Sequence, residues 1–164
     1  MEKIILAGLL FTGGLFLAGC AGGGGNAPMS ILGESAGRHR QPVVDSDLGG
    51  LWAIKSAELA GKPLVTPPEF ELRITENRYS AGVSSSYSDH GRIELFGDEL
   101  AGQARRLDVV VEVGMNKGKR IPALYRMIGR DLEIIYDMSG VSRPTEFISR
   151  EGTQLFRATY RKKI

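Results

Sequence analysis

Apolar and polar residues alternate along many short stretches in the last two thirds of the chain. In the stretch 70–75, with the sequence FELRIT, every second residue is apolar. A period of two places these side chains on one face of a β-strand, whereas a helix needs a period near 3.6. The same pattern predicts eight strands, at 51–59, 70–75, 78–83, 91–96, 106–113, 120–128, 132–136 and 153–161.

The connections between these strands are short, which predicts antiparallel neighbours that follow the order of the chain. We interpret Gly61-Lys62-Pro63 as a turn and 137–150 as a longer loop. Closing a meander removes its exposed edges, so the sequence predicts an all-β fold, a small eight-stranded antiparallel up-and-down barrel. Pro122 cannot donate to a ladder, so we expect its strand at an edge or with a bulge near its start.

A barrel of this size is either filled by its own side chains or holds one small ligand. Alternation alone does not distinguish these two interiors, although medium to large inward residues slightly favour a filled one. The predicted interior residues are Trp52, Ile54, Phe70, Leu72, Ile74, Tyr79, Ile93, Leu95, Leu107, Val109, Val111, Tyr125, Met127, Leu132, Ile134, Tyr136 and Phe156.

Composition excludes several classes of function. The net charge of +2 is too weak a bias to indicate nucleic-acid binding. A single cysteine excludes an internal disulfide, and His39 and His90 are too distant in sequence to indicate a metal site. Asp89 and His90 could in principle form an acid–base pair, but adjacent residues of a strand point to opposite faces, so we do not expect them to do so. We expect no cofactor, no metal and no enzymatic activity.

The start of the chain has the pattern of a secretion signal. Lys3 precedes an apolar segment at 4–16, which is too short to span a bilayer as a helix, and Leu17-Ala18-Gly19 leads into Cys20. This segment resembles the lipobox of bacterial lipoproteins, which implies cleavage before Cys20 and lipidation of its thiol. Ala21 after it implies sorting to the outer membrane. The alternatives are an ordinary secretory signal with a chance cysteine, or an uncleaved anchor.

These patterns divide the chain into three parts. Residues 1–19 are expected to be a lipoprotein signal peptide, 20–46 a lipidated cysteine with a flexible Gly- and Ser-rich linker, and 47–164 the barrel domain. The expected localisation is the cell envelope, at the outer membrane or the periplasmic face, with the protein held by its N-terminal lipid.

Several short motifs follow one another along the barrel segment. They are Leu48-Gly-Gly-Leu-Trp52, Ser56-Ala-Glu58 with Gly61-Lys-Pro63, Leu72-Arg-Ile74 before Tyr79, Tyr125 followed by Gly129-Arg-Asp-Leu132, and Arg143-Pro-Thr-Glu-Phe147. Residues 48–161 thereby resemble a lipocalin-like domain family that is found repeatedly in planctomycete proteins. The resemblance implies a small antiparallel barrel and brings neither an established activity nor catalytic residues. The chain departs from the family at Lys119-Arg-Ile-Pro122, where a Gly-rich strand entry is usual.

Candidate site residues follow from the interior list and from the loop motif. The candidates for lining a ligand site or plugging the barrel are Trp52, Ile54, Tyr79, Tyr125, Met127, Tyr136 and Phe147. The resemblance implies that Trp52 closes one end, beneath Arg157 or Arg161.

Arg143 has two interpretations. It either binds an anion at the barrel mouth, or it bonds to loop carbonyls or Asp137 while Phe147 forms a lid.

Our leading interpretation is a non-enzymatic, lipid-anchored envelope protein whose lipocalin-like barrel binds a small apolar or amphipathic molecule. The alternative is a protein–protein interaction module of the envelope with a solid barrel. The expected partners are the membrane, through the N-terminal lipid, and a small hydrophobic ligand or an envelope protein. We expect a monomer.

Overall fold

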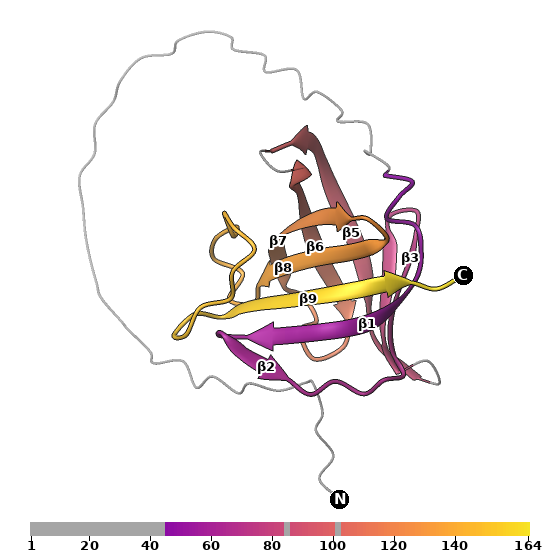
Figure 1. The fold of residues 1–164 in the computed structure, drawn as a ribbon, viewed down its shortest axis with the longest axis horizontal. Helices are drawn as coiled ribbons and strands as arrows, with labels where there is room; N and C mark the ends of the chain where they lie inside the picture. The colour runs from indigo at the N-terminus through magenta and orange to yellow at the C-terminus, as the bar shows by residue number, and fades with distance from the viewer. Residues whose placement is uncertain (1–44, 84–85, 101–102) are drawn as a thin grey trace, which may run out of the picture. The chain divides into compact units, whose positions relative to one another are not determined.

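The computed structural model describes residues 45–83, 86–100 and 103–164, and residues 41–164 form a compact unit by themselves. Within the described ranges the chain forms nine strands (Figure 1). Their bounds are β1 (Gly50–Leu59), β2 (Lys62–Leu64), β3 (Phe70–Thr75), β4 (Arg78–Val83), β5 (Ser86–Glu99), β6 (Arg105–Val113), β7 (Arg120–Ile128), β8 (Asp131–Asp137) and β9 (Leu155–Lys162).

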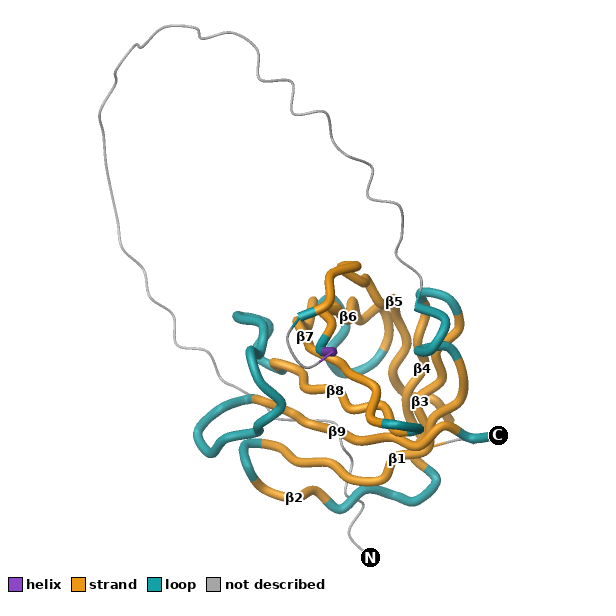
Figure 2. The backbone as a smooth tube through the Cα atoms, turned by 45° about the horizontal axis from the view of Figure 1, so that its top comes forward, coloured by secondary structure: helices purple, strands orange, loops and turns teal. Residues whose placement is uncertain are grey.

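Eight of these strands close into an antiparallel barrel in sequential order. Each strand from β3 to β9 pairs with the next along the chain, and β1 joins the two ends by pairing with β3 and β9. The β1–β9 ladder runs from Trp52↔Lys162 to Leu59↔Phe156, with a bulge between Ile54 and Ser56. Figure 2 shows the strands wrapping around one interior. The predicted all-β, eight-stranded up-and-down barrel is therefore confirmed.

The ninth strand corrects the turn that was predicted at Gly61-Lys62-Pro63. Ala60 and Gly61 both have positive φ, 52° and 74°, and form the two-residue turn of a β-hairpin. Lys62 and Pro63 belong to β2, which pairs with the last three residues of β1. The turn was predicted too late in the chain. Alanine seldom adopts positive φ, so Lys62-Pro63 carried the stronger turn signal.

Two further details differ from expectation. β5 begins at Ser86 rather than 91, because Gly82 and the bulge beside it let β4 and β5 pair up to Val83↔Ser86. The strand with Pro122 is neither at an edge nor bulged, since β7 pairs with β6 without a register shift. The β7–β8 ladder starts at Ala123↔Tyr136, one residue after Pro122, so the proline lies where no β8 partner is paired.

The barrel interior contains every residue that the alternation predicted to be there. All of them belong to the buried core cluster or pack against it. The cluster also includes Leu48, Ile121, Ala123, Ala158 and Tyr160. Burial of such side chains at roughly 1.5–3 kcal/mol each is the main source of stability for this fold.

Gly91 of β5 lies where the neighbouring strands β4 and β6 leave no room for a side chain. A Cβ at this position would lie 2.0 Å from the Val110 carbonyl oxygen and 2.8 Å from Cε1 of Tyr79. Because the carbonyl belongs to the paired strand β6, it cannot rotate away. We expect Gly91→Ala to lower the free energy of unfolding of residues 41–164 by about 3 kcal/mol in urea titrations. Gly49→Ala is the control, since its Cβ would have an ordinary 3.5 Å contact. Equal stability of the two variants would contradict the packing.

Candidate functional site

One end of the barrel is closed by Trp52. Its side chain is 0% exposed, and its indole Nε1 donates a hydrogen bond to the Leu48 carbonyl at 2.9 Å. Leu48, only 2% exposed, belongs to the same cluster. The chain thus folds over the start of β1 and fills this end with its own side chains. We refer to it as the closed end.

The cation above Trp52 is Lys162, not Arg157 or Arg161. Lys162 Nζ lies 5.1 Å from the indole centroid, and Gly50 leaves room for its stem, since a Cβ there would lie 2.8 Å from Lys162 Cε. Arg157 and Arg161 flank inward-facing residues of β9 and therefore face outward, where they bond to Glu133 and Asp131. The prediction had the correct strand and the wrong face.

Asp45 fastens the segment before β1 to the closed end. Its carboxylate accepts hydrogen bonds from the Tyr125 hydroxyl at 2.8 Å and from Arg105 at 2.5 Å. Burial raises the pKa of Asp45, but the hydrogen bonds from Tyr125, the Asp47 amide and Arg105 outweigh it and leave the pKa below its ordinary value. Asp45 is therefore held as a carboxylate.

The other half of the interior is less completely buried. Eight apolar side chains pack against the core and yet keep partial exposure. Two of them, Leu95 and Met127, lie toward the closed end. We call the other six the half-buried belt: Ile54, Phe70, Ala81, Tyr136, Met138 and Phe156. They come from the neighbouring strands β8, β9, β1, β3 and β4 and from the first residue after β8. Tyr136 and Phe156 stack with ring centroids 5.6 Å apart. This belt is an accessible apolar surface on the inner side of the wall.

Tyrosine hydroxyls add polarity to this inner surface. Burial, followed by the neighbouring Tyr160 and Tyr79, raises the pKa of Tyr136 well above its ordinary value. Burial likewise raises the pKa of Tyr160 to about 12. The Tyr136 ring is partly exposed and stacks on Phe156 in the interior. Hydrogen-bonding groups and apolar surface are therefore close together inside the barrel.

Asp89 lies opposite Ala81 in the β4–β5 ladder. Its Oδ1 atom is buried without a hydrogen-bond partner, and a Cβ on Gly114 would lie 1.7 Å from it. Burial raises the pKa of Asp89. His90, the next residue, interacts instead with the Ser80 hydroxyl and the Tyr87 carbonyl, each at 3.1 Å. The two side chains therefore do not form a hydrogen-bonded acid–base pair.

Arg143 lies on the outer wall, away from the half-buried belt. Its guanidinium donates to the carbonyls of Leu107 and Ala123 at 2.5 and 2.7 Å and to Asp108 at 2.5 Å. Asp137, the alternative partner, instead accepts hydrogen bonds from Ser139 and Ser142. The loop arginine thus bonds to strand carbonyls and a strand carboxylate.

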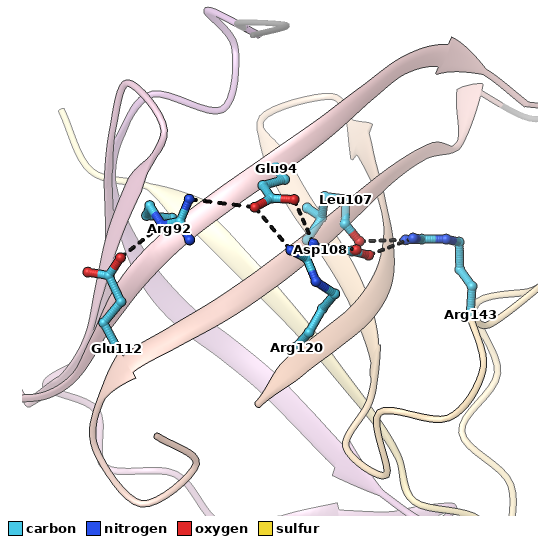
Figure 3. Close-up of polar contacts among 7 residues, drawn as sticks. All are labelled: Arg92, Glu94, Leu107, Asp108, Glu112, Arg120 and Arg143. Atoms are coloured by element: carbon cyan, nitrogen blue, oxygen red, sulfur yellow. Dashed lines mark hydrogen bonds and ion pairs between the residues drawn. The ribbon is translucent and has the colours of Figure 1, made fainter. Parts of the chain in front are cut away.

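The contact between Arg143 and Asp108 continues into a row of ion pairs across β5, β6 and β7 (Figure 3). Arg120 joins Asp108 to Glu94, and Arg92 lies between Glu94 and Glu112. Most of these groups are partly exposed, so each pair contributes little alone. Asp108 is the exception because it is buried, and two arginines compensate its charge.

The loop after β8 covers a second apolar layer outside the barrel. Leu124 and Ile135 are 2% and 0% exposed, yet they alternate with core residues and lie outside the core cluster. Pro144 in the loop is also buried. Phe147 packs on the Arg126 guanidinium at 4.2 Å on this outer face. The prediction that Phe147 forms a lid over the barrel is therefore wrong.

The candidate residues of the sequence thus fall into three places. Ile54 and Tyr136 belong to the half-buried belt, with Tyr79 beside them in the interior. Trp52, Tyr125 and Met127 lie toward the closed end, whereas Phe147 and Arg143 lie on the outer wall. Cys20 and the signal and linker segments lie outside the described residues.

Sequence reasoning missed Asp45 and Lys162, because their roles depend on segments that meet only after the barrel closes. It placed Ala81 on one face with Tyr79 and Val83 but left it off the list of interior residues, and it missed Met138. The alternation Tyr79-Ala81-Val83 was a usable signal for Ala81.

The chain matches no family model, no curated protein and no solved structure among those compared. Within the described ranges, no group of three or more His, Cys, Asp or Glu residues is arranged to hold a metal ion. The same residues include no helix long and apolar enough to cross a membrane.

Asp45 gives a pH-dependent test of the closed end. We expect Asp45→Asn to lower the free energy of unfolding by about 2 kcal/mol at neutral pH, because Tyr125 and Arg105 lose a charged acceptor. The pKa of Asp45 in the folded protein lies below its ordinary value of 3.8, so this stabilisation is present above that value and is lost as pH falls through the folded pKa. Urea titrations should show the two proteins converging below about pH 4.

Asp47→Asn is the matched control, since Asp47 is exposed and its backbone contacts remain. A constant difference between wild type and Asp45→Asn down to the lowest pH would show that the carboxylate charge is not responsible.

Proposed function

We propose that the barrel binds a small amphipathic molecule through the half-buried belt. The observation that carries this proposal is the contrast between the two halves of one interior. The closed end is packed around a fully buried tryptophan, and only Leu95 and Met127 among the core-packed side chains described there keep partial exposure, whereas six such side chains of the half-buried belt do so. Apolar lining with a few polar groups is the usual composition of a small-molecule site.

The chemistry of the belt suggests how such a molecule lies. Its apolar part contacts Phe70, Met138 and the stacked pair Tyr136–Phe156. Its polar part reaches the hydroxyl of the partly exposed Tyr136, which lies beside the buried Tyr160. We infer a binding role without catalysis, because the side chains of this inner surface offer no nucleophile paired with a base.

We further propose that the protein is a lipid-anchored component of the cell envelope. This part rests on the sequence alone, on the apolar segment 4–16 and on Leu17-Ala18-Gly19-Cys20. The lipocalin-like family assignment is likewise a proposal from the motifs in residues 48–161, and the barrel is compatible with it. In the alternative proposal the barrel is an interaction module that takes up no ligand.

Ligand uptake can be tested with residues 41–164, which form a compact unit with a complete core. We expect a dansylated fatty acid to bind with a blue-shifted emission and Ala81→Phe to weaken binding at least about tenfold, because the new ring occupies the belt. Ser80→Phe is the control, since it adds the same ring on the opposite face of β4.

Ala81→Leu provides a milder variant if the phenylalanine prevents folding, and a far-UV spectrum with a melting curve establishes that each variant is folded. Absence of probe binding by the wild type, or equal binding by the Ala81→Phe and Ser80→Phe proteins, favours the interaction module.

The anchor has its own test in the full chain. Cys20→Ser removes the thiol that would carry the lipid, so we expect no incorporation of labelled palmitate and release from the membrane fraction after a salt wash. Ser35→Ala, a change in the same linker, should leave both unchanged. Incorporation of label into the Cys20→Ser protein would show that the lipobox interpretation is wrong.

A further inference from the structure

The turn between β6 and β7 exposes apolar and basic side chains together. Val113 is 52% and Met115 is 59% exposed, while Lys117 and Lys119 are exposed in the same turn. The stretch from Val113 to Arg120 contains no acidic residue. Large apolar side chains at such exposure on a loop tip have no role in the core, which makes them candidates for contact with another surface.

A third exposed apolar side chain comes from the loop after β8. Val141 is 85% exposed, and its neighbour Gly140 lies against the start of β7, since a Cβ there would be 3.0 Å from the Arg120 carbonyl oxygen. The loop after β8 therefore brings Gly140, the residue before Val141, to the start of β7, where the β6–β7 turn ends. We define the rim patch as Val113, Met115, Lys117, Lys119 and Val141.

The charge of the rim patch is not compensated locally. Glu112 is bonded to Arg78 and Arg92, and Arg120 to Glu94 and Asp108. Asp89 packs against Gly114 and accepts a hydrogen bond from the Met115 amide, and it forms no ion pair with Lys117 or Lys119. Within the described part of the chain, Lys117 and Lys119 have no ion-pair partner within 4.0 Å. Two free cations therefore stand beside three exposed apolar side chains.

We propose that the rim patch docks on an anionic lipid surface. Val113, Met115 and Val141 enter the boundary between headgroups and acyl chains, and Lys117 and Lys119 meet the lipid phosphates. Apolar area combined with basic side chains is the composition that binds this interface, and each lysine contributes about 1 kcal/mol near an anionic surface. Separate apolar side chains on two loops, one of which also carries two unpaired lysines, suit a lipid interface better than the continuous apolar core of a protein interface.

The rim patch lies at the end of the barrel opposite the closed end. Its Val141 is three residues after Met138 of the half-buried belt. Docking would thus bring the accessible inner surface close to the lipid that supplies amphipathic molecules. The proposal goes beyond ligand binding and stands without it, because the patch lies on the outside.

The test uses residues 41–164 with vesicles of phosphatidylcholine, with and without phosphatidylglycerol. Met115→Trp introduces a reporter at an exposed position, while the native Trp52 is 0% exposed and supplies a constant background. We expect a blue shift and quenching by brominated acyl chains with the anionic vesicles only. Lys117→Ser and Lys119→Ser should each weaken cosedimentation about fivefold.

The matched control is Arg130→Ser, which removes one exposed positive charge in the β7–β8 turn at the closed end. Equal weakening by Arg130→Ser and Lys117→Ser would mean that net charge alone drives binding and would overturn the proposal. An unshifted emission spectrum of the Met115→Trp protein with anionic vesicles would also overturn the proposal. This outcome covers the case in which the rim patch binds a protein and not a lipid surface. Fatty-acid binding in solution is measured separately, so each proposal can fail without affecting the test of the other.

Discussion

The pairing of β1 with β9 is the contact on which the rest of the structure depends. It joins the first and last strands into a closed wall, so that the edge groups of β1 and β9 are paired with each other. The alternating faces of the eight strands then have one inside and one outside. The ladder also brings Lys162 above Trp52, which links closure of the wall to closure of one end.

The two halves of the interior differ although the same alternation builds both. Near the closed end, Trp52 and Leu48 fill the space and Asp45 holds the incoming chain in place. Farther along, β1 leaves β3 and takes the short strand β2 as its neighbour. The inner wall there carries partly exposed rings. The two halves of one interior thus differ in how completely their apolar side chains are buried.

The fold could be predicted from the sequence because period-two alternation is a local signal. Strand β7 was predicted with its observed bounds, and every predicted interior residue lies in the core or against it. The site was harder to predict because it depends on contacts between distant segments. Arg143 meets carbonyls of β6 and β7, and Lys162 replaces the expected arginines over Trp52. Nothing in the local pattern around these residues specifies their partners. The same holds for the bulge after Ile54, which shifts the β1–β9 register by one residue.

The loop after β8 buries the outward-facing Leu124 and Ile135, so one side of the barrel has an apolar layer on its outer face. Strands β7 and β8 are covered by apolar packing on both faces there, while outward residues of β3, such as Arg73 and Thr75, meet solvent. Positions on the covered side are thus constrained twice, by the interior and by the overlying segment. Substitutions on the solvent-facing side of the barrel are therefore less constrained in evolution. On the side covered by the loop, a change in a strand residue requires a matching change in the loop.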